Sequence, residues 1–187
     1  MHKLCLAAAL AAAAAISLAS REAHATDFYV EGSVSGGGST WGTDPNVQGA
    51  LRTGFEFVDI VSVDFQARLG YAAVDERLLE MVGIGTKLAL PFETVIPHVR
   101  LHAVHFHEVP VAAMTEDPAM HVLGVGDGIR HRFGFEGALG LSYVFAIVDR
   151  TRFLAQAEAY VDAFPDDGKG PMVYGGAGLG LGLQYDI

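Results

Sequence analysis

The last part of the chain, residues 172–187, alternates between two kinds of side chain. Odd positions carry apolar residues such as Val173, Leu179 and Leu181, and most even positions carry glycine or, as at Gln184, a polar residue. A period of two is the pattern of a β-strand with one apolar face and one small or polar face. The segment has about the length that a tilted strand needs to cross a bilayer. An isolated strand would leave backbone N–H and C=O groups unpaired in lipid, so it requires a closed barrel.

The same alternation recurs in seven segments further upstream. The fifth is less regular near Val104, which suggests a β-bulge. Residues 36–45 and 109–127 are expected to be loops, and the second of these is the longest. Eight alternating segments predict an all-β fold, an eight-stranded antiparallel up-and-down transmembrane barrel. The predicted strands are residues 27–35, 46–57, 61–72, 78–90, 95–108, 128–145, 152–164 and 172–187.

The N-terminus has the features of an export signal. A short positive start precedes an apolar, alanine-rich run, and Ala23 and Ala25 are small residues at the two positions that a signal peptidase requires. We therefore predict a cleaved signal peptide over residues 1–25 and a barrel domain over residues 26–187. The apolar run is short for a transmembrane helix. The only cysteine, Cys5, leaves with the signal, so the mature domain has no thiol for a disulfide or a metal site.

The composition of the mature domain favours a membrane location. Lys87 and Lys169 are its only lysines, and the mean hydropathy of the chain is positive. Soluble domains usually carry a surface of mixed lysine and glutamate. A soluble eight-stranded barrel of the lipocalin kind would show the same alternation, but the scarcity of lysine argues against it. An acidic exported chain is also a poor candidate for nucleic-acid binding.

Aromatic side chains gather toward the predicted strand ends. The interface girdles of a membrane barrel would lie there. The residues concerned are Phe28, Phe55, Phe57, Tyr71, Phe92, Phe106, Tyr143, Phe145, Phe164 and Tyr185.

On this strand pattern, residues 27–187 resemble the small eight-stranded outer-membrane barrels: the OmpA transmembrane domain, the OmpX and Ail proteins, and the opacity-like surface proteins. The resemblance implies a cell outer-membrane location, contact with outer-membrane lipids and lipopolysaccharide, and insertion by the barrel-assembly machinery. It also implies a non-enzymatic role in envelope integrity or surface interaction, and it does not identify a surface partner. Such proteins typically end in an aromatic residue that the assembly machinery reads. This chain departs from that pattern, because it ends in Ile187 with Tyr185 two positions earlier.

The polar face of the predicted strands carries equal numbers of acidic and basic residues. An eight-stranded barrel is only wide enough inside for side chains, and a buried charge is costly unless it is paired. A proton or ion path is one interpretation, and a lumen plugged by ion pairs is the simpler one, which we favour. The expected lumen residues are Glu31, Arg52, Glu56, Asp64, Arg68, Lys87, Arg100, Arg130, Arg132, Glu136, Glu158 and Asp162.

The fifth predicted strand contains four histidines within ten residues. They are His98, His102, His105 and His107. His105 and His107 share one strand face, about 7 Å apart. With a third ligand, for which His121, His131 and Glu108 are candidates, they could hold zinc or copper. We take His105, His107 and His121 as the candidate metal ligands. The simpler interpretation is a set of polar residues at a wet barrel mouth, with no cofactor, and a pH-responsive loop is a third, since histidine titrates near neutrality.

No catalytic constellation is apparent. Outer-membrane lipid hydrolases use a Ser/His pair at the lipid-facing rim, but the neighbours of His131 on its face are Ile129 and Phe133, and Ser142 is far down the strand. The glycine-rich segments lack the lysine of a phosphate-binding loop. We therefore predict that the chain is not an enzyme.

The predicted external loops are strongly acidic. Simple solvation explains this, and the functional alternative is divalent-cation bridging to lipopolysaccharide phosphates or contact with a cationic partner. The acids are Asp44, Asp75, Glu76, Glu108, Glu116, Asp117, Asp127, Asp166 and Asp167, against Arg77 and Lys169.

Overall fold

The computed structural model describes residues 26–39, 44–57, 60–90, 92–115, 118–122, 124–168 and 173–187. The predicted signal peptide, residues 1–25, lies outside these ranges. Eight strands dominate the described chain, and two short helical segments lie between the fifth and sixth. The elements are β1 (Asp27–Ser39), β2 (Asn46–Phe57), β3 (Val61–Ala72), β4 (Arg77–Ala89), β5 (Val95–Pro110), η1 (Val111–Thr115), α2 (Pro118–Val122), β6 (Arg130–Val148), β7 (Thr151–Ala163) and β8 (Val173–Asp186).

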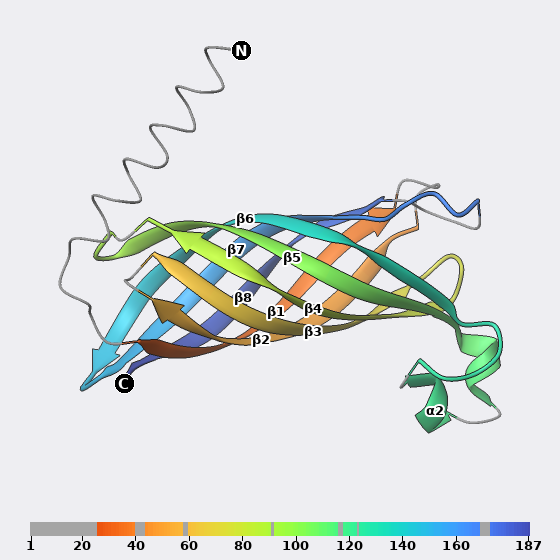
Figure 1. Cartoon of the computed structure of the whole chain (residues 1–187), viewed down its shortest axis with the longest axis horizontal. Coiled ribbons are helices and arrows are strands. Elements are labelled where there is room, and N and C mark those ends of the chain that lie inside the picture. Colours follow the sequence, from red (N-terminus) through yellow and green to blue (C-terminus); the bar gives the residue numbers. More distant parts are fainter. Residues whose placement is uncertain are drawn as a thin grey trace, which may run out of the picture.

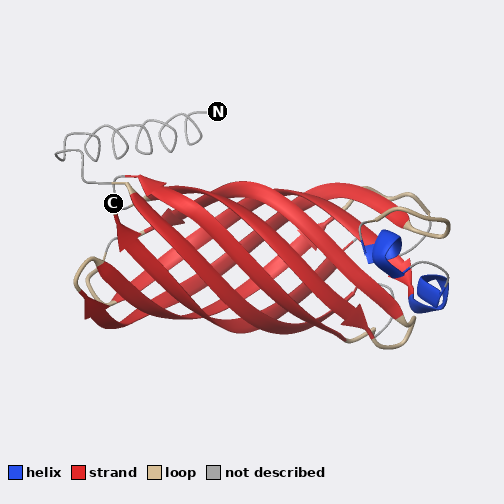
Figure 2. Ribbon diagram, turned by 90° about the horizontal axis from the view of Figure 1, so that it is seen from below, coloured by secondary structure: helices blue, strands red, loops and turns tan. Residues whose placement is uncertain are grey.

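The strands form a closed antiparallel barrel in sequence order (Figures 1 and 2). β1 pairs with β2 on one side and with β8 on the other, in a register that runs from Asp27↔Asp186 to Ser39↔Tyr174. Closure gives every strand a hydrogen-bonded neighbour on both sides, which is the condition for a sheet to sit in hydrocarbon. The predicted eight-stranded up-and-down barrel is therefore confirmed.

The two ends of the barrel differ. One end carries the β2–β3, β4–β5 and β6–β7 turns together with the C-terminus, and we call it the turn end (Figure 1). The opposite end, which we call the loop end, carries the other four connections, including η1 and α2. Within the described residues, no helix is long and apolar enough to cross a membrane.

The strand boundaries agree with the predicted ones to within three residues, except at the end of β1. β1 continues to Ser39, so the glycines at 36–38 lie in a strand and not in a loop. A Cβ at Gly37 would lie 2.2 Å from the carbonyl oxygen of Gly175 on β8, so this close approach requires glycine.

The predicted bulge near Val104 is wrong. β5 pairs without interruption with both β4 and β6 through this position, and the register shift lies instead in β6, between Val144 and Ala146. The alternation of β5 weakens because, near the loop end, its inward face becomes apolar and its outward face becomes polar. Val104 and Phe106 are buried inside the barrel, whereas His105 is only partly buried.

An apolar cluster fills the lumen at the loop end. Phe106 stacks on Phe164 with ring centroids 5.0 Å apart. These two aromatics, expected in the interface girdle, are buried inside, because the strands extend beyond the charged part of the lumen and need apolar filling there. Other predicted girdle residues, such as Phe55, Tyr143 and Tyr185, are exposed. The cluster consists of Ala72, Leu79, Met81, Val104, Phe106, Phe164 and Tyr174.

Candidate functional site: the ionic lumen and the outer histidine cluster

Arg100 is the central base of the lumen. β5 turns it inward, and its side chain is fully buried. Its guanidinium contacts carboxylates from three other strands: Glu31 at 2.5 Å, Asp64 at 2.8 Å and Glu158 at 3.0 Å. Because the lumen is narrow, charges from β1, β3, β5 and β7 meet at this one side chain.

The other lumen bases extend this network. Each contacts two carboxylates, so the pairs are shared and not isolated. Four bases and six carboxylates thereby form one connected set across the lumen. The further pairs are Arg52 with Glu158 (2.5 Å) and Glu136 (3.9 Å), Arg68 with Asp162 (2.9 Å) and Glu136, and Lys87 with Glu56 (3.2 Å) and Glu31 (3.8 Å).

Two histidines belong to this network. His102 is fully buried between two carboxylates, with Nδ1 3.0 Å from Glu136 and Nε2 against Asp64. His98 places Nε2 3.4 Å from Glu158. In the alternation of the fifth predicted strand, His98 and His102 lie on the same face as Arg100. They therefore belong to the lumen and not to a group of histidines at the barrel mouth.

Arg130 and Arg132 do not reach this central network, although they were expected among the lumen ion pairs. Arg130 contacts Glu108 at 2.7 Å and also Asp167, and the guanidinium of Arg132 lies 4.8 Å from the ring centroid of Phe164. β6 begins at Arg130, so both side chains lie at the loop end, beside the apolar cluster and beyond the charged part of the lumen. The equal count of acids and bases in the sequence therefore does not describe the central lumen.

Three histidines meet on the outer side of the loop end. Nε2 of His105 lies 2.6 Å from Nε2 of His107, and one nitrogen from each of His105, His107 and His131 lies within 4.8 Å of the others. His121, on α2, is buried, lies next to Gly126 and is not in this group. The candidate ligand set with His121 is therefore not the one that the structure brings together. The β5–β6 register places His131 opposite His107, and local spacing does not reveal such a pairing.

A serine and a histidine approach each other in the lumen, a pairing that the sequence did not indicate. Ser142 Oγ lies 3.4 Å from His98 Nδ1, and His98 Nε2 lies 3.4 Å from Glu158. The distance between Ser142 and His98 exceeds the reach of about 2.6–3.2 Å between a nucleophile and its base. Glu158 is also bound by Arg52 and Arg100, so the three groups form part of the polar filling of the barrel.

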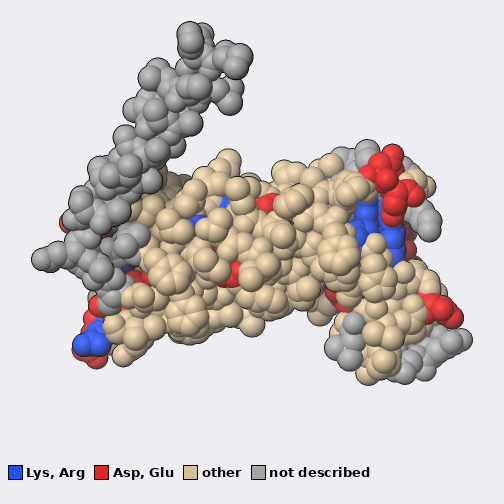
Figure 3. All heavy atoms as spheres, in the orientation of Figure 1, with Lys and Arg blue, Asp and Glu red and all other residues tan. Residues whose placement is uncertain are grey.

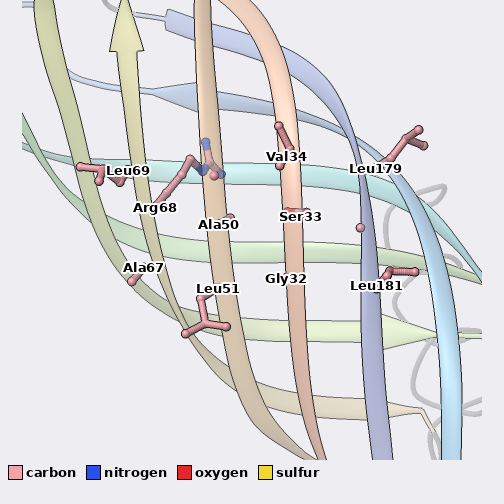
Figure 4. A pocket seen from close by; sticks show the side chains of 12 residues that line it. Gly32, Ser33, Val34, Ala50, Leu51, Ala67, Arg68, Leu69, Leu179 and Leu181 are labelled. Atoms are coloured by element: carbon pink, nitrogen blue, oxygen red, sulfur yellow. The ribbon is translucent and has the colours of Figure 1, made fainter.

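A shallow groove marks the outer surface of β8, β1, β2 and β3 (Figure 4). Exposed Val34, Leu51 and Leu179 line it, with Gly32 between them. Among the lining residues only Arg68 is charged, and its guanidinium is paired inside the barrel. The groove therefore offers apolar contact and no catalytic group.

No protein-family model matches this sequence, and comparison with curated proteins gives no match. Solved structures are similar. Neisserial surface protein A superposes with a TM-score of 0.58 at 14% identity, covering 89% of this chain and 100% of that one. The N-terminal β-barrel domain of Pseudomonas aeruginosa OprF gives 0.56 at 16% identity, covering 88% and 100%. Ail of Yersinia pestis, in complex with the heparin analogue sucrose octasulfate, gives 0.52 at 14% identity, also covering 88% and 100%. These likenesses concern the fold: the chain has the architecture of the small eight-stranded outer-membrane barrels.

Proposed function

We propose that the chain is an outer-membrane barrel without enzymatic activity, which serves envelope integrity or surface interaction and has a lumen plugged by ion pairs. The observation that carries this proposal is the inverted polarity of the barrel. Large apolar side chains cover the outside, where Phe135 is 72% and Leu139 66% exposed, while charged side chains fill the inside. Water-soluble proteins rarely expose a continuous apolar surface of this extent, whereas a bilayer accommodates it.

The distribution of charge supports the same proposal. On the face shown in Figure 3, acidic and basic residues gather at the two ends, and only a few charged residues are visible on the belt between them. The groove of Figure 4 would accept acyl chains along this belt. Outer-membrane lipids and lipopolysaccharide are accordingly the proposed neighbours, and the barrel-assembly machinery is the proposed route of insertion.

Cell fractionation tests the location. We expect the protein in the outer-membrane fraction, resistant to a urea wash, because the apolar belt is stable only in hydrocarbon. Unheated samples should migrate differently from boiled samples on a detergent gel, since the closed barrel resists detergent until it is heated. A soluble periplasmic protein expressed in the same cells serves as the control. Recovery in that soluble fraction would contradict the proposal.

Planar-bilayer recording tests the plug. We expect little steady conductance, because Arg100 and its carboxylate partners fill the centre and the apolar cluster around Phe106 fills the loop end. Eight strands leave no room for a water channel beside these side chains. An open porin inserted under the same conditions provides the positive control. A large and stable open channel would disprove the plugged lumen.

The surface contact that we propose uses cations. The similar structure of Ail contains sucrose octasulfate, which is a polyanion. The loop end of this chain carries more acids than bases, among them the exposed carboxylates of Asp75 and Asp166, so a polyanion would be repelled. Divalent cations that bridge these carboxylates to lipopolysaccharide phosphates fit this charge better.

A further inference from the structure

We infer that His105, His107 and His131 bind a zinc ion on the outer side of the loop end, with Glu80 as the carboxylate that orients His107. This goes beyond the proposed barrel function, because neither the membrane belt nor the plugged lumen requires ligating side chains at this place.

Strand register brings the four residues together. Glu80 of β4 lies opposite His107 of β5, and His107 lies opposite His131 of β6, so these three form a row across adjacent strands. His105 lies two residues before His107 and therefore shares its face. The row lies at the border of the apolar belt. There the ring centroids of Phe133 and His105 are 4.3 Å apart.

The spacing of the imidazoles is close to that of a metal site. Ring centroids are 4.5 Å apart for His105 and His107, 4.6 Å for His107 and His131, and 5.7 Å for His105 and His131. Nitrogens bound to tetrahedral zinc at about 2.0–2.1 Å are separated by about 3.3 Å. The Nε2 atoms of His105 and His107, which are 2.6 Å apart, must therefore move slightly away from each other to bind zinc. The exposed ring of His131 must turn toward them.

Two buried polar atoms of the cluster lack a hydrogen-bond partner among the described residues. These are Oε1 of Glu80, whose residue is only 8% exposed, and Nδ1 of His105. Buried polar atoms without a partner are uncommon. The other oxygen of Glu80 lies 3.7 Å from Nδ1 of His107. A carboxylate behind a ligating histidine is the usual support of a zinc site, because it fixes the ring and its tautomer.

The ligand type favours zinc or copper over calcium and magnesium. Neutral imidazoles suit zinc and copper, whereas calcium and magnesium prefer oxygen ligands. Gly124, at φ +73°, packs its backbone against His107 so closely that a Cβ there would lie 2.0 Å from the ring. The β5–β6 connection therefore covers the histidine cluster on the side of His107, whereas the side of His131 is exposed. Three protein ligands leave a fourth position for water or for a phosphate oxygen of the outer leaflet.

Calorimetric titration of the refolded, tag-free mature protein with zinc chloride in detergent tests the site. The variants are the double change His105→Ala/His107→Ala, the single change His131→Ala, and Glu80→Gln. His121→Ala is the matched control, because it removes a neighbouring histidine outside the cluster. Heat-dependent gel migration of each variant shows whether the barrel has folded, independently of zinc binding.

We expect one zinc per chain for the unaltered protein. The double variant should lose about 100-fold or more in affinity, since two of three protein ligands are gone, and His131→Ala should lose roughly 10-fold or more for the same reason. Glu80→Gln should lower the zinc affinity about 10–100-fold, the range for loss of a carboxylate that supports a metal ligand. His121→Ala should bind as the unaltered protein does. The site is disproved if the unaltered protein binds zinc no more tightly than the double variant does. It is also disproved if His121→Ala loses as much zinc affinity as His131→Ala. An unchanged Glu80→Gln overturns the role of Glu80.

Discussion

We expect Arg100→Leu to lower the free energy of unfolding by about 3–5 kcal/mol, the range for breaking a buried charge pair. Arg100 is fully buried, and its removal leaves the carboxylates of Glu31, Asp64 and Glu158 without their shared partner. The measurement is urea unfolding of the protein refolded into lipid vesicles, with the folded fraction read from heat-dependent gel migration.

Arg150→Leu is the matched control, because Arg150 is exposed in the β6–β7 turn and its loss should leave stability nearly unchanged. A double change, Glu31→Gln with Arg100→Leu, should recover part of the lost stability, since one of the stranded charges is then neutral. A loss below about 1 kcal/mol for Arg100→Leu, within the range of exposed pairs, would contradict the network.

Phe106→Ala is expected to cost about 3–5 kcal/mol, the range for removing a large aromatic side chain from a packed interior. Its ring lies 5.0 Å from that of Phe164 and 5.2 Å from that of Tyr174, measured between centroids, so truncation leaves a cavity at the loop end. The same urea unfolding in vesicles measures the loss.

Phe135→Ala is the matched control on the outer face. Phe135 is 72% exposed, and lipid tails can fill the space that its ring vacates. The loss should therefore be clearly smaller than for Phe106→Ala. Equal losses at the two positions would show that the apolar cluster is not a packed core.

The sequence by itself determined the strands and their two faces. Alternation is a local property of the pleated backbone, so a period of two is visible without knowing any long-range contact. The eight segments that it predicted correspond to β1–β8, and Glu31, Asp64 and Arg100 fall on one face as predicted. The apolar residues left on the other face, such as Leu179, indicated a barrel that needs lipid around it.

Only the tertiary structure decided which residues meet. Asp64 and His102 are 38 positions apart and sit on strands that are not neighbours, so their contact depends on how the closed barrel folds across its lumen. The same holds for the histidines, where the register of β5 and β6 brings His131 to His107 and leaves His121 outside. Arg130 looks equivalent to Arg100 in the alternation, yet its height along the barrel axis separates it from the central carboxylates. Height and register are set by closure of the whole sheet, and no local pattern contains them.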